Sequence, residues 1–193
     1  MSSLNFIKKS LLLLLFVPFI TLSQLGDYYT SDTNPKAKGL NFKIKSPIGF
    51  EQSIADRPNI VQKWTKDKTD NNKIIQFGII VKKEGFLAEL KKDDFKYYLK
   101  NEGGVKDFVA DIPGASNYRY FSVDNFPGFI TDIETQIDRL DLSFTLYMTQ
   151  ITVFVGSYVF TLQLTSPVKK NRENYKSLLF QLANSIIFTD QYK

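Results

Sequence analysis

Hydrophobic and polar residues alternate along most of this chain, which is the pattern of half-buried β-strands. Leu40, Phe42 and Ile44 alternate with polar residues and predict a strand that ends at the turn 46–49. Runs rich in β-branched and aromatic residues predict further strands at 60–65, 74–81, 118–123, 129–137, 142–154 and 158–165. Hairpin loops such as 66–73 join successive runs, so we expect antiparallel pairing. The run 74–81 is apolar at nearly every position and predicts a central strand covered on both faces.

A helix interrupts the strands after residue 90. Its apolar side chains recur on one helical face, at Phe95, Tyr98 and Leu99. Asp93 or Asp94 is the expected N-cap. Gly103 and Gly104 are expected to stop the helix.

A second helix is predicted at the end of the chain, with Asn171 as its cap. Its apolar stripe, which we expect to pack on the sheet, consists of Tyr175, Leu178, Leu179, Leu182 and Ile186. The sequence shows no repeat and no second hydrophobic block. We therefore predict one α+β domain over residues 39–190, with a central antiparallel sheet flanked by helices.

Residues 1–23 have the features of a secretory signal peptide. Lys8 and Lys9 precede the apolar run 11–20, and small residues precede an expected cleavage point before Gln24. The run is shorter than the roughly 20 apolar residues of a membrane-spanning helix. No cysteine is present for lipid attachment. We therefore expect a periplasmic or secreted protein without membrane insertion after cleavage, a retained anchor being the alternative. The polar segment 24–38 is expected to form a flexible leader outside the core.

The composition narrows the possible chemistry. The chain of 193 residues contains neither cysteine nor histidine, which excludes disulfides, thiol nucleophiles and imidazole bases. Its net charge of +5 becomes +3 if Lys8 and Lys9 are removed, and only four basic residues are arginine. Because this small excess is spread along the chain, we do not expect nucleic-acid binding.

The order of elements resembles that of the PsbP/Mog-like group, which includes PsbP-related, Mog and DcrB-like proteins. The resemblance covers about residues 39–188 and is carried by the turn 47–50, by 158–162 before Ser166 and Pro167, and by the last helix. It implies a central antiparallel sheet flanked by helices and a binding or assembly role. It supplies no catalytic residue, and without histidine an imidazole metal contact cannot be transferred.

Four acids form the densest candidate site, at Asp132, Glu134, Asp138 and Asp141. On an extended strand, Asp132 and Glu134 share one face about 7 Å apart, where two carboxylates could transfer protons or hold a hard cation. We favour a solvent-exposed strand face instead. For Trp64 and for the aromatic residues at 118–129, we favour core packing over an interface or a base-stacking platform.

The leading hypothesis is a secreted or periplasmic, non-enzymatic binding or assembly module of the cell envelope, with a protein partner and with no cofactor, metal or catalytic residue. The alternatives are a carboxylate-dependent hydrolase and a carrier of a small apolar ligand. An enzyme should show acids converging in a cleft, whereas a binding module should show a partly apolar surface.

Overall fold

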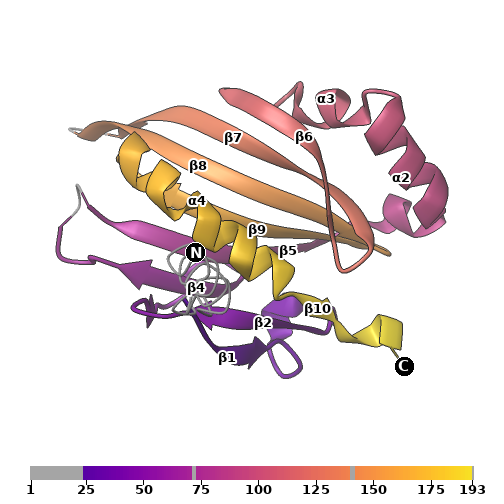
Figure 1. Cartoon of the computed structure of the whole chain (residues 1–193), viewed down its shortest axis with the longest axis horizontal. Coiled ribbons are helices and arrows are strands. Elements are labelled where there is room, and N and C mark those ends of the chain that lie inside the picture. The colour runs from indigo at the N-terminus through magenta and orange to yellow at the C-terminus, as the bar shows by residue number, and fades with distance from the viewer. Residues whose placement is uncertain (1–23, 71–72, 140–141, 193) are drawn as a thin grey trace, which may run out of the picture.

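A computed structural model describes residues 24–70, 73–139 and 142–192. The protein is α+β, with a seven-stranded antiparallel sheet and a three-stranded antiparallel sheet (Figure 1). The large sheet has the order β3 (Glu51–Gln52), β4 (Ile60–Lys66), β5 (Ile75–Lys83), β9 (Tyr158–Ser166), β8 (Leu142–Val155), β7 (Phe126–Arg139) and β6 (Ala115–Val123). The small sheet has the order β1 (Leu25–Thr30), β2 (Phe42–Pro47) and β10 (Ile187–Phe188). The helices are η1 (Pro35–Ala37), η2 (Gly85–Glu89), α2 (Lys92–Asn101), α3 (Gly104–Val109), α4 (Lys169–Asn184) and η3 (Thr189–Tyr192).

Helix α4 crosses one face of the large sheet, beside the small sheet (Figure 1). The predicted apolar stripe is confirmed, because Leu178, Leu179, Leu182 and Ile186 are buried and Tyr175 packs against the same core. The helix starts earlier than predicted, with Val168 as its N-cap. Burial of this stripe explains why α4 packs on the sheet.

The short helices α2 and α3 cover one end of the opposite face. Phe129 and Phe154 pack with them, whereas the adjacent Ile130 and Val153 belong to the core under α4. Successive residues of a strand point to opposite faces, so this end of the sheet is covered on both sides. The rest of that face is more open, since Gln76, Gly78 and Ile80 of β5 are half-buried. The predicted two-sided burial of β5 is therefore wrong along much of its length.

The helix boundaries around residue 100 also differ from the prediction. Asp93 and Asp94 lie in the first turn of α2, and Lys91 is the N-cap. Gly103 has a φ of 75°, a left-handed conformation that glycine adopts without strain. It reverses the chain between two helices, and Gly104 is the first residue of α3. The glycine pair therefore joins α2 to a second helix that the sequence did not predict.

The predicted flexible leader is wrong for residues 25–37. Tyr29 of β1 pairs with Ile44 of β2, and its ring lies 6.1 Å from that of Trp64 in an edge-to-face arrangement. The Ser31 hydroxyl donates to the Leu40 carbonyl oxygen at 2.8 Å. Ala37 is only 1% exposed. Strand pairing and these contacts order a segment that has no apolar period of its own, so the folded domain includes β1.

No helix among the described residues is long and apolar enough to cross a membrane. The predicted signal peptide at 1–23 lies outside these residues.

Candidate functional site

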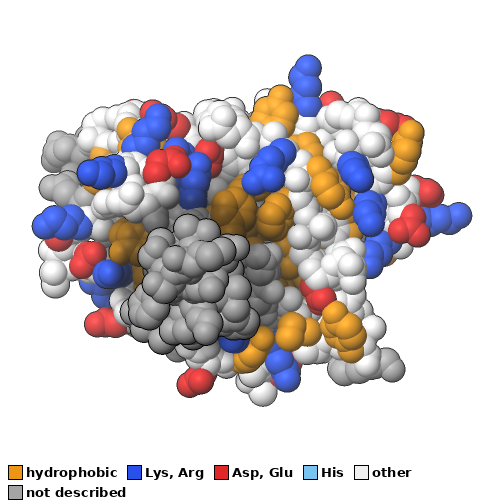
Figure 2. Space-filling model, viewed as in Figure 1, with side chains coloured by type: hydrophobic (Ala, Val, Ile, Leu, Met, Phe, Trp, Pro, Cys, Tyr) orange, Lys and Arg blue, Asp and Glu red, His pale blue; other side chains and the backbone are white. Residues whose placement is uncertain are grey.

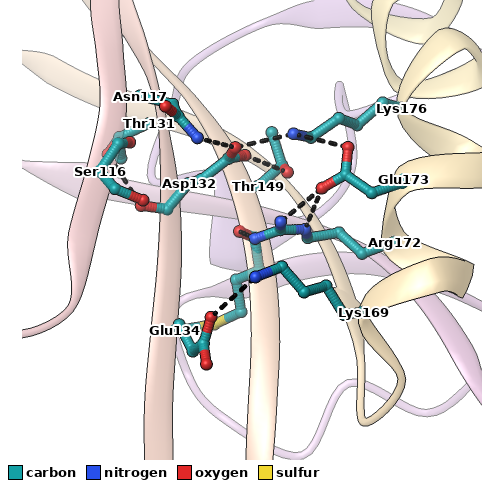
Figure 3. A network of polar contacts seen from close by, with 11 residues as sticks. Ser116, Asn117, Thr131, Asp132, Glu134, Thr149, Lys169, Arg172, Glu173 and Lys176 are labelled. Atoms are coloured by element: carbon teal, nitrogen blue, oxygen red, sulfur yellow. Dashed lines mark hydrogen bonds and ion pairs between the residues drawn. The ribbon is translucent and has the colours of Figure 1, made fainter.

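Asp132 lies on β7 and faces α4 (Figure 3). Its carboxylate accepts hydrogen bonds from Lys176 Nζ at 2.7 Å, Thr149 Oγ1 at 2.7 Å and Asn117 Nδ2 at 3.2 Å. Only 4% of the residue is exposed. Three donors from three elements therefore surround a carboxylate that is almost completely buried.

The protonation of Asp132 follows from two opposing effects. Burial by itself raises the pKa of the carboxyl, because it disfavours the charged form. The hydrogen bonds from Lys176, Thr149 and Asn117 and the charge of Lys176 outweigh burial and lower its pKa below the ordinary value. Asp132 is therefore an anion at neutral pH and does not serve as a proton donor.

A second acid, Glu173 of α4, continues the network. It contacts Lys176 Nζ at 3.1 Å, and Arg172 Nε donates to it at 3.1 Å. The Arg172 guanidinium is 5.8 Å from the centre of the Tyr147 ring, and the residue is only 4% exposed. Burial by itself raises the pKa of Glu173. The hydrogen bonds and charges of Lys176 and Arg172 together lower the pKa by more than burial raises it, so the net shift is downward.

Glu134 shares the α4 face of β7 with Asp132, as predicted. Its carboxylate is 3.5 Å from Lys169 Nζ, and 49% of its side chain is exposed. The prediction of a solvent-exposed face is therefore right for Glu134 and wrong for Asp132. Asp138 accepts a hydrogen bond from Ser143 Oγ at 2.6 Å, and Asp141 lies outside the described residues.

This arrangement fastens a helix to a sheet. Asp132, Glu134 and Glu173 each form an ion pair with a cation from α4. Within the described parts of the chain, no cluster of three or more acidic side chains could hold a metal ion. The sequence analysis missed Lys169, Arg172 and Lys176. Their spacing of three and four residues places them along one side of α4 and was the available signal.

The aromatic candidates belong to the fold. Trp64 is 4% exposed, which confirms its predicted place in the core. Phe121 packs near Phe180 of α4, with ring centres 5.8 Å apart, whereas Tyr120 packs with α2 and α3 on the other face. Phe121 and Tyr120 therefore pack against helices on opposite faces of β6, in agreement with the expected core packing.

An apolar groove lies where η2, α2 and α3 meet, with a volume of about 570 Å³. Its lining residues are Phe86, Glu89, Leu90, Lys91, Asp94, Phe95, Tyr98 and Phe108. Phe86 is 61% exposed and Leu90 is 45% exposed. Figure 2 shows hydrophobic side chains at the surface in the region where Figure 1 places α2. The sequence analysis did not predict this groove, because its residues come from three short elements.

A second hollow adjoins the groove. It measures about 60 Å³ and shares Leu90 and Phe95 with the groove as lining residues. Its lining also includes Phe126, Pro127 and Phe154 and the side chain of Lys92. The groove therefore adjoins a small recess at Leu90 and Phe95. The recess has room for a methyl or isopropyl group, but it is too small for a whole ligand, since ligand pockets usually measure about 300–1,000 Å³.

No family model and no curated protein matches the chain. Three solved structures similar to it are Mycobacterium tuberculosis LpqN, involved in cell envelope biogenesis, cyanobacterial PsbP (CyanoP) from Synechocystis sp. PCC 6803, and the Ran-binding protein Mog1p of Saccharomyces cerevisiae. LpqN is 12% identical, with coverage of 83% of this chain and 89% of LpqN and a TM-score of 0.47. CyanoP is 13% identical. The match covers 88% of this chain and 95% of CyanoP, with a TM-score of 0.45. Mog1p is 9% identical. The match covers 86% of this chain and 97% of Mog1p, with a TM-score of 0.45.

CyanoP and Mog1p belong to the group that the sequence resembles. Similarity at this level describes an arrangement of strands and helices and assigns no function. The functional argument below therefore rests on the groove and on the ionic network.

Proposed function

We propose that the protein is a non-enzymatic binding module of the cell envelope and that the groove between η2, α2 and α3 receives a protein partner. The observation that carries the proposal is the exposure of Phe86 and Leu90 beside a hollow of about 570 Å³. Contiguous exposed apolar surface on a soluble domain is typical of interaction sites. The neighbouring recess offers a place for one anchoring side chain.

The arrangement of the acids favours binding over catalysis. The buried Asp132 is held by Lys176, and Glu134 faces Lys169, so these two carboxylates have cationic partners. Glu89 and Asp94 line the groove, but both are exposed, and no described side chain is shown to orient either of them. A catalytic acid or base is usually held in place and has a shifted pKa.

Photo-crosslinking at single positions in the native envelope tests this proposal. A photoreactive phenylalanine analogue at position 86 should yield one discrete protein adduct. The matched control is the same analogue at Ile54, which is 84% exposed and lies between β3 and β4 at the opposite edge of the large sheet from β6. Equal adducts from both positions, or none from position 86, would contradict the proposed site.

Export is the second part of the proposal and rests on residues 1–23. The intact mass of the protein recovered from the envelope or the medium should correspond to a chain that begins at Gln24. A mass that includes residues 1–23, or recovery only with detergent, would contradict a soluble exported form.

A further inference from the structure

Two carboxylates, those of Glu89 and Asp94, line the groove beside Lys91, although the chain as a whole carries a net charge of +5. Lys91, Asp94, Phe95 and Tyr98 all line it, and their spacing of three and four residues places them on one face of α2 and its N-cap. Glu102 follows four residues after Tyr98, on the same face. Glu89 of η2 lines the groove as well.

Tyr98 shows that carboxylates gather at its end of the groove. Its hydroxyl donates a hydrogen bond to Asp107 Oδ2 at 2.5 Å. This hydrogen bond is the largest cause of the raised pKa of Tyr98, and the negative charges of Asp107 and Glu102 also raise it. Glu89 and Asp94 thus line the groove together with Lys91, two further carboxylates, of Glu102 and Asp107, lie near Tyr98, and Lys92 lines the adjoining recess.

The other lysines of α2 lie on a different face of the helix from the residues that line the groove. Lys92, Lys96 and Lys100 recur every four residues, two positions away from Asp94 and Tyr98, so they form a stripe on another side of the helix. Lys92 Nζ lies 4.3 Å from the centre of the Phe126 ring. Figure 2 shows Lys and Arg side chains gathered over α2 on the viewed face. Lys92 lines the recess, whereas Glu89 and Asp94 line the groove itself, so a cation of a partner is expected to meet the groove on the side of these two carboxylates.

We propose that the groove binds a protein segment in which a leucine or aromatic side chain is flanked by lysine or arginine. This inference rests on the proposed function and names the chemistry of the partner. The apolar side chain would lie between Phe86 and Leu90 and reach toward the recess, and the cation would meet Glu89 and Asp94. Exposed charges add less affinity than apolar anchors but select between partners, so the acids determine which apolar segments bind.

A random twelve-residue peptide library, displayed on phage and selected on the purified protein, tests the inference. The selected peptides should combine a leucine or aromatic residue with a lysine or arginine within a few positions. Their affinity, measured by fluorescence anisotropy, should fall at least tenfold with Leu90→Asp. It should fall about three- to tenfold with Glu89→Gln combined with Asp94→Asn, and the double variant should lose most of the salt dependence.

Asp93→Asn provides the matched control. Asp93 and Asp94 both lie in the first turn of α2, so either substitution removes the same favourable interaction with the helix dipole, but only Asp94 lines the groove. The affinity of the selected peptides should therefore be unchanged by Asp93→Asn. Circular dichroism should show that all variants are folded.

Several outcomes would overturn the inference. Selected peptides without enrichment in lysine or arginine would contradict the role of the acids, and so would equal losses from Asp93→Asn and Asp94→Asn. A library that yields no peptide dependent on Leu90 would also overturn it, as would tight binding of a long-chain fatty acid or an apolar dye alone. If crosslinking from position 86 persists in any of these cases, the proposed function stands and only the partner chemistry is wrong.

Discussion

Asp132 on β7 and Lys176 on α4 form an ion pair of 2.7 Å across 44 positions of sequence. The side chain of Asp132 is 5% exposed and that of Lys176 is 23% exposed. A buried charge is tolerated when it is paired and fully hydrogen-bonded, and Thr149 and Asn117 complete the shell of Asp132. The pair therefore joins α4 to β7 through a buried, hydrogen-bonded carboxylate.

The first prediction concerns loss of this pair. Lys176→Met should lower the free energy of unfolding by about 2 to 4 kcal/mol, because it leaves the Asp132 carboxylate buried without its cation. Lys170→Met is the control, since Lys170 is an exposed residue of the same helix. Urea unfolding at neutral pH measures both variants. Equal effects of the two substitutions would show that the ion pair does not stabilise the fold.

The second prediction is the pH dependence of stability. The pKa of Asp132 is lower in the folded protein than the ordinary value of 3.8, so the unfolded chain takes up protons first as the pH falls. The stability contributed by Asp132 should be complete above about pH 5 and should be lost as the pH falls through 4 and below. Asp132→Asn should make unfolding less pH-dependent in this window. Urea unfolding at several pH values from 6 to 3 gives the free energy of unfolding as a function of pH. If that free energy falls equally steeply with pH in both proteins, the assignment to Asp132 is wrong.

The third prediction concerns the apolar face of α4. Leu179 is completely buried, so Leu179→Ala should cost about 2 to 5 kcal/mol of unfolding free energy, the usual range for a buried leucine. Ser177 lies on the exposed face of the same helix, and Ser177→Ala should change stability by less than about 0.5 kcal/mol. A loss below about 0.5 kcal/mol for Leu179→Ala in denaturant melting would mean that the helix is peripheral.

Strands and the closing helix were predictable because their burial repeats at a simple period. The runs that became β5, β7, β8 and β9 agree with the prediction to within about three residues at each end, and the stripe of α4 is buried as expected. The segment of β1 has no such period. Tyr29 is fixed there by its pairing with Ile44 and its contact with Trp64, which are distant in sequence.

The candidate site was harder to predict, because alternation assumes that one face of a strand meets solvent. Asp132 lies between Ile130 and Ile133, at a point where α4 covers one face of β7 and α3 lies near the other. Its burial depends on Lys176 of a helix whose position a single sequence does not reveal. The groove depends likewise on how η2, α2 and α3 come together.

The fourth prediction compares two glycines of the large sheet. A Cβ on Gly128 would lie 2.1 Å from the Thr152 carbonyl oxygen, whereas a Cβ on Gly78 would meet nothing within 4 Å. Gly128→Ala should therefore destabilise the protein by about 1 to 3 kcal/mol, since the backbone of β8 must move. Gly78→Ala should be neutral or stabilise by up to about 1 kcal/mol, because it restricts the unfolded chain. Thermal unfolding measures both, and similar melting temperatures for the two variants would contradict this packing.

The last prediction is that the protein binds no divalent metal tightly and hydrolyses no substrate through its β7 acids. Asp132 and Glu134 share a face, but each has a lysine partner, at 2.7 Å for Lys176 and 3.5 Å for Lys169, with which a metal would have to compete. Calorimetric titration with calcium, magnesium and zinc at pH 7 should therefore show no affinity in the micromolar range. A broad panel of hydrolase substrates should show no turnover that is lost with Asp132→Asn combined with Glu134→Gln. Micromolar metal binding or turnover that this double variant abolishes would replace the binding-module proposal with a carboxylate-dependent enzyme, because the acids would then be exchanging their lysine partners for a ligand.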